Sequence, residues 1–394
     1  TGNSNTAIGQ HALLLNTTGG FNTAVGATAL DANTTANNNT AIGYGSLSGN
    51  TTGDKNTAVG QGSMLNNTTG HSSTAIGKDC LVSNTTGNYN TAIGLQALDA
   101  NTTAGFNVAI GSGALGAVNT SANTAVGHNA AHNATSAENL VCIGTDAGNA
   151  ITTGSHNTII GRNAGTSVTS GFRNVIIGYE AATSLTSTQE NVCIGTDSAD
   201  EMTTGRYNTC VGNNSAHNLT SGQHNVFIGH ATVTAGGDEE KQIVLGTDVT
   251  SQGSYRFTFG RDGDRVHNQF NSNASWTRNS DERKKKDILT NTDLGLDFIN
   301  DLRTVTYKWK APCDLPETMS GYNKDETEPS HKDKMYGFIA QEVKAALDKH
   351  SITDFNGWSE DKNGEQGVSY EMFVMPLVKA VQELSAKVTA LEAG

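Results

Sequence analysis

The sequence predicts a mostly β protein. We expect a parallel β-roll or solenoid of about fifteen 17-residue coils, then a short β connector, then an α+β domain that ends in a helix. Three observations predict this order. An aliphatic residue followed by glycine recurs at a fixed interval up to residue 246, charged residues become frequent only later, and the last residues follow a helical heptad spacing. A period of this length is typical of stacked repeats rather than of disorder, although Gly, Asn and Thr dominate the composition.

Fifteen glycines define the repeat, and the motif around them is Asn-Thr-Ala-Ile/Val-Gly. They are spaced by 17 residues, with one step of 16, and comprise Gly9, Gly26, Gly43, Gly60, Gly77, Gly94, Gly111, Gly127, Gly144, Gly161, Gly178, Gly195, Gly212, Gly229 and Gly246. Glycine accepts backbone angles that a Cβ forbids, so we expect each coil to turn there. Asn stands four residues earlier in twelve of the fifteen repeats, and stacked Asn side chains are expected to form amide ladders.

The residues before each glycine predict a short strand that is apolar on both faces. The residue immediately before glycine is always Ile, Val or Leu, and we expect it to fill the interior of the coil. The residue two before glycine points to the opposite face. It is Ala up to Ala125 and mostly larger from Cys142 onward. We expect this second row to face other chains around an axis that is tight at first and widens toward the C-terminus.

The second half of the repeat has two forms. Up to about residue 118, a Leu or Met stands four residues after most of the glycines, as at Leu30. Farther along, the apolar residue stands seven after glycine, as at Ile151. This change predicts a different packing register in the later coils.

The cysteines predict neither disulfides nor a metal site. The five are Cys80, Cys142, Cys193, Cys210 and Cys313, and their spacing matches no metal-binding motif. Three of them occupy one position of the repeat, where other coils have Ala, Ile or Phe, so we expect buried small apolar side chains. Nothing in the sequence predicts a metal or another cofactor.

The position just before the repeat's Asn varies widely, which is typical of an exposed turn. Phe21, Tyr89, Phe106 and Tyr207 stand there and are candidate receptor-facing residues. An unconstrained surface explains the same variation.

Residues 247–279 are expected to form a β connector at a trimer junction. Segments 255–260 and 265–270 predict two strands around a turn at 261–264. The formal net charge of −13 argues against a nucleic-acid partner. No segment approaches the roughly 18 apolar residues of a membrane helix, so no membrane insertion is expected.

The repeats of residues 1–246 resemble the heads of trimeric autotransporter adhesins, and they are similar to repeats of some phage tail fibres. The Asn-Thr-Ala-Ile/Val-Gly motif carries this resemblance. It implies a homotrimeric β-roll and names no ligand.

Four blocks in the C-terminal part carry a second resemblance. They are Ser280-Asp-Glu-Arg-Lys-Lys-Lys-Asp-Ile288, a helix–strand pattern at 296–309, Tyr336-Gly-Phe-Ile-Ala-Gln-Glu-Val343, and a closing Tyr and helix at 368–384. In this order they resemble the intramolecular chaperone at the C-terminus of endosialidase tailspikes, phage neck appendages and tail fibres. The resemblance covers residues 280–394. It implies assisted trimerisation followed by autoproteolysis with a serine–lysine dyad. Nothing in the sequence itself indicates an enzyme that acts on external substrates.

Carried over from this family, Ser280 is the nucleophile, Lys285 is the base, and the Ser280–Asp281 bond is cleaved. A serine hydroxyl is a weak nucleophile that needs a base beside it. A lysine serves as that base when desolvation or neighbouring cations lower its pKa.

The residues around the dyad have supporting roles. Lys284 and Lys286 flank the base and help to lower its pKa, and either of them is an alternative base. Lys284 replaces the aliphatic residue that the family has there. Arg283 and Asp281 are expected to hold the loop.

The last helix predicts a coiled-coil seam. The seam residues alternate in spacings of three and four and are Val374, Leu377, Val381, Leu384, Val388 and Leu391. We expect this helix to clasp the fibre or its copies. The alternative is one amphipathic helix that packs on its own domain.

Together these features predict a tail fibre or appendage segment of a virion, made in the host cytoplasm. The expected partners are two further copies of the chain, other virion tail proteins, and a glycan or protein receptor on the host cell. One alternative is a glycan-degrading tailspike whose enzyme domain lies upstream, although the repeats show no recurrent carboxylate pair. Another is a trimeric bacterial surface adhesin.

Overall fold

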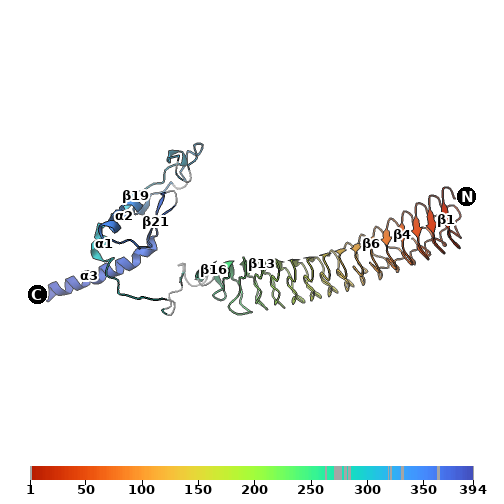
Figure 1. The fold of residues 1–394 in the computed structure, drawn as a ribbon, viewed down its shortest axis with the longest axis horizontal. Helices are drawn as coiled ribbons and strands as arrows, with labels where there is room; N and C mark the ends of the chain where they lie inside the picture. The colour runs from red at the N-terminus through yellow and green to blue at the C-terminus, as the bar shows by residue number, and fades with distance from the viewer. Residues whose placement is uncertain are drawn as a thin grey trace. The chain divides into compact units, whose positions relative to one another are not determined.

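The computed structural model describes residues 2–261, 264–269, 277–278, 282, 285–317, 319, 322–329, 332–361 and 364–393. The chain divides into two compact units, Thr1–Ser280 and Asp281–Gly394, each of which is described by itself. In Figure 1 the first unit is a long stack of coils that begins at the N-terminus.

The first unit is a parallel β-solenoid. Each coil contributes one short strand, which pairs in parallel with the strand of the next coil at the same repeat position, as in Ala24↔Ala41. The strands are β1 (Thr6–Ile8), β2 (Thr23–Val25), β3 (Thr40–Ile42), β4 (Thr57–Val59), β5 (Thr74–Ile76), β6 (Thr91–Ile93), β7 (Val108–Ile110), β8 (Thr124–Val126), β9 (Val141–Ile143), β10 (Thr158–Ile160), β11 (Val175–Ile177), β12 (Val192–Ile194), β13 (Thr209–Val211), β14 (Val226–Ile228) and β15 (Ile243–Thr247). The predicted solenoid of about fifteen coils is confirmed.

The recurring glycine has the backbone conformation that the repeat predicted. Gly26 has a φ of 137°, and a Cβ there would lie 2.5 Å from the carbonyl oxygen of Gly43 in the next coil. Any side chain at this position would therefore collide with backbone.

The predicted orientation of the strands was wrong. In each strand from β2 to β15 the residue two before glycine points into the solenoid and is fully buried, whether it is Ala24 or Phe227. The residue before glycine lies on the outer face, where Ile42 and Ile76 are 40% and 39% exposed. Period-two alternation shows which residues share a face, but it does not show which face is inside. The change from Ala to larger residues therefore concerns the interior of one chain and not an axis between chains.

The interior keeps its volume by exchanging large and small residues. In the first half Ala fills the strand centre, and Leu30 or Leu47, four residues after glycine, fills the remaining space. In the second half Ile159 and Ile176 occupy strand centres, and Gly165 leaves room for them, since a Cβ there would lie 3.2 Å and 3.1 Å from their Cδ1 atoms. Val168, seven residues after glycine, is fully buried beside them. The predicted shift from position four to position seven is confirmed.

Asparagine ladders hold the coils together. Asn22 Oδ1 accepts the backbone N–H of Asn39 at 2.9 Å, and Asn39 Nδ2 donates to the carbonyl oxygen of Gly53 at 2.8 Å. This is the predicted ladder. The structure adds a second one in the first half, seven residues after glycine, where Asn33 Nδ2 donates to Asn16 Oδ1 at 2.8 Å. It ends at Asn101, whose Oδ1 has no hydrogen-bond partner within the part of the chain that the structure describes.

The connector continues the sheet. Strand β16 (Arg256–Arg261) pairs in parallel with β15, β17 (Asp264–Gln269) pairs antiparallel with β16, and β18 (Thr277–Arg278) pairs antiparallel with β17. The two predicted connector strands are confirmed as β16 and β17.

The second unit is a small α+β fold that ends in a helix, as predicted. Its elements are α1 (Leu296–Asp301), β19 (Val305–Tyr307), η2 (Pro312–Asp314), β20 (Met335–Gly337), α2 (Ala340–Lys349), β21 (Trp358–Glu360), β22 (Gln366–Val368), η3 (Tyr370–Phe373) and α3 (Val374–Glu392). The strands form two antiparallel pairs, β19 with β20 and β21 with β22. The core consists of five buried residues, which are Phe298, Val343, Ala346, Leu347 and Phe373. Among the residues that the structure describes, no helix has the length and apolar character that a membrane crossing requires.

Candidate functional site

The predicted cleavage segment is described only in part. Ser280, Asp281, Arg283 and Lys284 lie outside the described residues. Lys285 and Lys286 are described and exposed. The backbone N–H of Lys285 donates to the carbonyl oxygen of Glu282 at 2.9 Å, which makes a turn just after the candidate cleavage point. The assignment of Ser280 as nucleophile and Lys285 as base therefore stays a prediction.

The residues just after this turn are apolar and uncovered in the single chain. Ile288 is 60% exposed and Leu289 is 87% exposed. Exposing two consecutive aliphatic side chains to water is unfavourable in free energy. We therefore expect this segment to pack against another surface.

Helix α3 is anchored on its own unit by one face. Pro376 and Ala380 are buried on that face. Glu383 Oε2 accepts the backbone N–H of Leu296 at 2.8 Å, at the first residue of α1. This bond, with the ammonium of Lys379 beside it, keeps the pKa of Glu383 below its usual range. The carboxylate therefore fixes where α1 sits along α3.

A neighbouring face of α3 carries the predicted seam, and all of it is exposed. The six seam residues, Val374, Leu377, Val381, Leu384, Val388 and Leu391, have between 45% and 82% of their surface accessible. The helix does pack on its own domain, but through other residues than the seam. The seam thus remains available for another chain.

The ends of α1 and α2 are joined by ion pairs. Asp301, the last residue of α1, contacts Lys349 Nζ and His350 Nε2, each at 2.7 Å. Both contacts lower the pKa of Asp301. Arg303 pairs with Glu342 on α2, with a distance of 3.0 Å from Nε to Oε2. These exposed pairs hold the two short helices in one arrangement but contribute little stability each.

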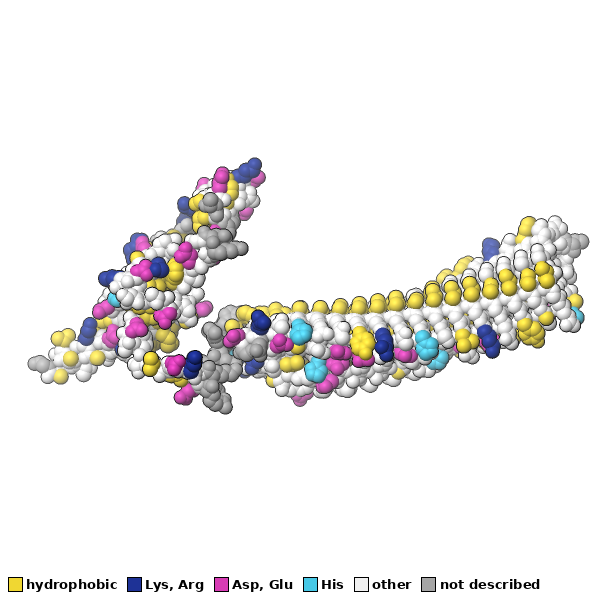
Figure 2. Space-filling view, viewed as in Figure 1, with side chains coloured by type: hydrophobic (Ala, Val, Ile, Leu, Met, Phe, Trp, Pro, Cys, Tyr) yellow, Lys and Arg dark blue, Asp and Glu magenta, His cyan; other side chains and the backbone are white. Residues whose placement is uncertain are grey.

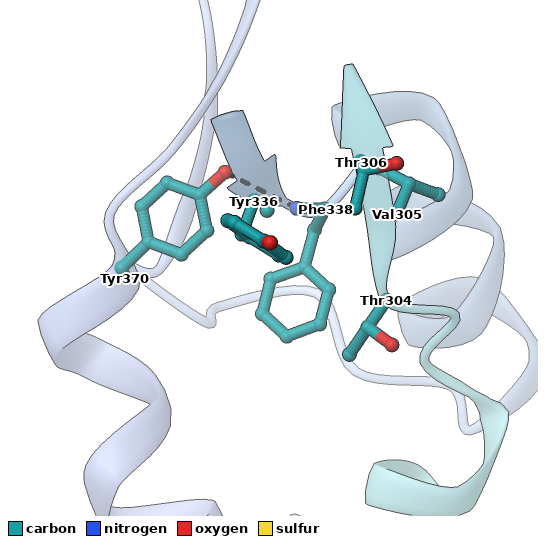
Figure 3. Close-up of a pocket in the computed structure, with 7 residues that line it drawn as sticks. Thr304, Val305, Thr306, Tyr336, Phe338 and Tyr370 are labelled. Carbon is teal, nitrogen blue, oxygen red and sulfur yellow. Dashed lines mark hydrogen bonds between the residues drawn. The ribbon is translucent and has the colours of Figure 1, made fainter. Parts of the chain in front are cut away.

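An open pocket of about 640 Å³ lies between β19, β20 and Tyr370 (Figure 3). Tyr370 Oη accepts the backbone N–H of Phe338 at 3.1 Å, and the two rings stack 5.7 Å apart. Gly337 makes this possible, because a Cβ there would lie 2.1 Å from the Tyr370 hydroxyl. The pocket brings together the second, third and closing blocks of the resemblance, and the contact between the third and the closing block is one that sequence reasoning missed. Gly337 and Tyr370 both belong to blocks that carry the resemblance, and this was the sequence signal from which the contact could have been inferred.

The outer face of the solenoid carries a continuous aliphatic stripe. It consists of the residue before glycine in each coil and comprises Ile8, Val25, Ile42, Val59, Ile76, Ile93, Ile110, Val126, Ile143, Ile160, Ile177, Ile194, Val211, Ile228 and Leu245. All are half-buried or exposed in the single chain. Figure 2 shows a line of apolar side chains running along the solenoid.

The four candidate receptor-facing aromatic residues lie at exposed turns. Phe21, Tyr89, Phe106 and Tyr207 all have φ angles near +60° (58° to 62°), and their exposed fractions range from 36% to 67%. Tyr89 stacks on Phe106 with ring centroids 5.1 Å apart, and Tyr207 stacks on His224 at 4.7 Å. The turn conformation is strained for such bulky residues.

Comparison with known proteins concerns the second unit. Residues 280–352 match the family described as chaperone of endosialidase. This span starts at the candidate nucleophile and ends just after α2. No curated protein and no solved structure matches the chain. The match fits the resemblance that the four C-terminal blocks carry. Residues 280–352 are thus similar to a chaperone domain of the endosialidase type, and in this chain they follow a β-solenoid of about fifteen coils.

Proposed function

We propose that this chain is a homotrimeric fibre segment of a virion tail or appendage that serves in host attachment, and that its C-terminal domain assembles the trimer and then releases itself by autoproteolysis. The observation that carries the proposal is the chaperone-family match, which begins at Ser280. The described geometry supports it at two surfaces, the aliphatic stripe and the α3 seam.

The stripe is the surface through which three solenoids associate in this proposal. A contiguous apolar row over the whole length of a rod is rare on a protein that stays monomeric. Because every coil contributes the same kind of residue at the same position, three parallel copies bury their stripes around one axis. The β-roll resemblance supports the number three.

The α3 seam brings the three chaperone domains together. Its residues are exposed in the single chain, while Pro376 and Ala380 already attach the helix to its own unit. Valine at the first and leucine at the fourth heptad position favours two strands in an isolated coiled coil. The number three therefore comes from the solenoid and the family, and α3 serves as a clasp rather than as the determinant of copy number.

The clasp fixes the register in which the three solenoids align. Fifteen nearly identical coils keep most of their contacts when one chain slips by a whole coil. The seam of α3 occurs once per chain and has a defined beginning and end. Three chains joined there start their solenoids at the same coil. Removal of the clasp afterwards leaves an assembly that cannot easily unfold and refold, so it is kinetically trapped.

Release uses the serine–lysine chemistry of the family. The neutral amine of Lys285 takes the proton of the Ser280 hydroxyl, and the resulting alkoxide forms an ester bond to the carbonyl carbon of Ser280. The C–N bond to Asp281 breaks as the Lys285 ammonium returns the proton to the leaving amine, and water then hydrolyses the ester. One water is consumed, and the products are a carboxylate on Ser280 and an amino group on Asp281. The proposed base stands five residues after the proposed nucleophile, and its backbone N–H donates to the carbonyl oxygen of Glu282.

Intact mass spectrometry of the purified chain tests the release. We expect two fragments that join at residue 280, and none in Ser280→Ala. Lys285→Ala is expected to slow cleavage by about 10²-fold or more, as for loss of a general base. Lys284→Ala and Lys286→Ala are the matched controls, because each removes one cation of the same run and leaves the proposed base.

Two results would contradict this proposal. A wild-type chain that stays intact under native conditions removes the autoproteolytic step. Cleavage that survives Lys285→Ala but stops in one of the two controls moves the base to that lysine.

A further inference from the structure

Three rows of side chains run side by side along one edge of the later coils. Residues 17 apart occupy the same place in successive coils, which rise by about 4.8 Å each. One row presents two amides and a guanidinium, and the neighbouring row presents hydroxyls. Together with Thr188 these two rows line a groove of about 410 Å³. The amide and guanidinium row consists of Gln189, Arg206 and Gln223, and the hydroxyl row consists of Ser187, Thr204 and Ser221.

An aromatic pair forms the third row beside the groove. Tyr207 and His224 stack with ring centroids 4.7 Å apart and planes 11° from parallel. The guanidinium of Arg206 lies over the Tyr207 ring at 5.7 Å. The pair directly follows the amide and guanidinium row in sequence, so the rings and the polar groups reach the same edge.

The groove's polar groups are held in place by one another. Arg206 Nε donates to Gln223 Oε1 at 2.8 Å. Gln189 Nε2 donates to Tyr207 Oη at 3.1 Å. The nearby carboxylate of Glu190 pairs with Arg173 at 3.3 Å and does not line the groove. Side chains that are already oriented lose less entropy when they bind a ligand.

The chemistry of these rows selects one class of ligand. Hydroxyl and amide groups donate to and accept from sugar hydroxyls, a guanidinium donates to them, and an aromatic ring stacks on the apolar face of a pyranose. The lining has no aliphatic side chain for an apolar ligand and no carboxylate for a metal ion. One guanidinium in a chain with a net charge of −13 is too little for a nucleic acid.

We propose that this groove binds an oligosaccharide whose chain runs along the solenoid axis, with about one sugar for each coil. The coil rise is comparable to the length of one pyranose residue, so the repeated donors meet repeated sugar hydroxyls. The inference rests on the proposed role in host attachment and names the ligand class for it. No residue of the aliphatic stripe lines the groove. In Figure 2 most of the charged and histidine side chains on this face of the solenoid lie apart from the apolar line.

The test uses the full chain on an array of neutral and uronic-acid-containing oligosaccharides, followed by saturation-transfer NMR with the member that binds best. Tyr207→Ala and Arg206→Ala are each expected to weaken binding about tenfold or more, because a stacked ring or a charged donor is lost. Phe21→Ala is the matched control. Phe21 occupies the same repeat position with nearly the same φ, 62° against 60°, and lies far from the groove in sequence.

Three outcomes overturn the proposal. The wild-type chain retains no saccharide, the two groove variants bind as well as the wild type, or Phe21→Ala loses as much binding as they do. Adsorption to host cells without saccharide binding would assign attachment to a protein receptor. Cleavage at residue 280, measured on the same preparations, reports separately on the chaperone, so the two proposals fail in distinguishable ways.

Discussion

The solenoid and the C-terminal unit each leave a row of aliphatic side chains uncovered in the single chain, but they build that row in opposite ways. The solenoid offers one residue from each of fifteen coils, always at the same place of the repeat. Helix α3 offers six residues within 18 positions, from Val374 to Leu391. The first row is long and uniform, and the second is short and unique.

This difference suggests that one row stabilises the assembly and the other specifies its register. The solenoid closes its own interior with buried aliphatic residues and two asparagine ladders, so each coil is held by its neighbours. Among the residues that the structure describes, the C-terminal unit has a buried cluster of five residues, with Phe298 and Phe373 as its largest side chains. A uniform row tolerates many registers, whereas a unique row tolerates one. The smaller unit can therefore determine how the repetitive unit assembles.

The largest effect is expected from a charge in the α3 seam. Leu384 is 51% exposed, so in a monomer Leu384→Asp changes stability by about 0.5 kcal/mol or less. In the assembled seam it places three carboxylates in one layer, and each buried charge costs several kcal/mol. Light scattering in the Ser280→Ala background, which keeps the domain attached, is expected to show loss of the trimer mass.

Gln382→Asp is the matched control for the seam. It introduces the same side chain two residues earlier, at an exposed position outside the 3–4 spacing. It is expected to keep the trimer mass. If both variants keep it, α3 is not the clasp, and the solenoid stripe assembles the chain without help.

A smaller effect is expected when the loss of stability is compared between a variant in the middle of the second asparagine ladder and a variant at its end. Asn67 Oδ1 accepts from Asn84 Nδ2, and Asn67 Nδ2 donates to Asn50 Oδ1, both at 2.8 Å. Asn67→Ala leaves a buried acceptor without its donor, which costs about 1–3 kcal/mol. Asn101→Ala likewise leaves the Asn84 Oδ1 acceptor without its donor, but Asn101 Oδ1 accepts no hydrogen bond within the described residues, so this variant breaks fewer ladder bonds and its cost is expected to be smaller.

Hydrogen exchange read coil by coil measures this difference, because a long repeat array does not unfold as one two-state unit. The coils around residue 67 are expected to lose more protection than those around residue 101. Equal losses at both positions would mean that the amide ladder adds nothing beyond the volume of the side chain.

The repetitive part of the fold could be predicted because each of its rules is tested fifteen times within one sequence. The glycine conformation, the ladder four residues before glycine and the buried cysteines all follow from residue type at a fixed position. The inside and outside of the strand could not be assigned, since both faces are apolar and alternation is symmetric. The ladder from Asn16 to Asn101 was missed because Asn-Thr-Thr-Gly is also typical of a turn.

The C-terminal unit could be predicted only through its resemblance to a family. Helix α1, strand β19 and helix α3 lie where two of the blocks predicted a helix followed by a strand and a closing helix, yet the contact between Tyr370 and Phe338 joins positions 32 residues apart. A contact of this kind cannot be predicted from the periodicity of the sequence. The groove at Arg206 was missed for a related reason, since its chemistry arises only when three coils are stacked.

The smallest effect concerns the thiols, four of which lie in the solenoid and one in the C-terminal unit. Burial raises the pKa of Cys80 and of Cys142 to about 12, against 9.0 for the unfolded chain. The neutral thiol is thus favoured in the folded state, and this contribution is complete below pH 9.0 and is lost as the pH rises toward 12. Each such thiol is expected to cost about 1.4 kcal/mol of solenoid stability between pH 8 and pH 10. Cys142→Ala is expected to reduce this loss of stability at alkaline pH. Ellman's reagent at pH 8 is expected to react with Cys313 well before it reacts with the solenoid thiols. Equal reaction rates for all five thiols would show that the coils open readily.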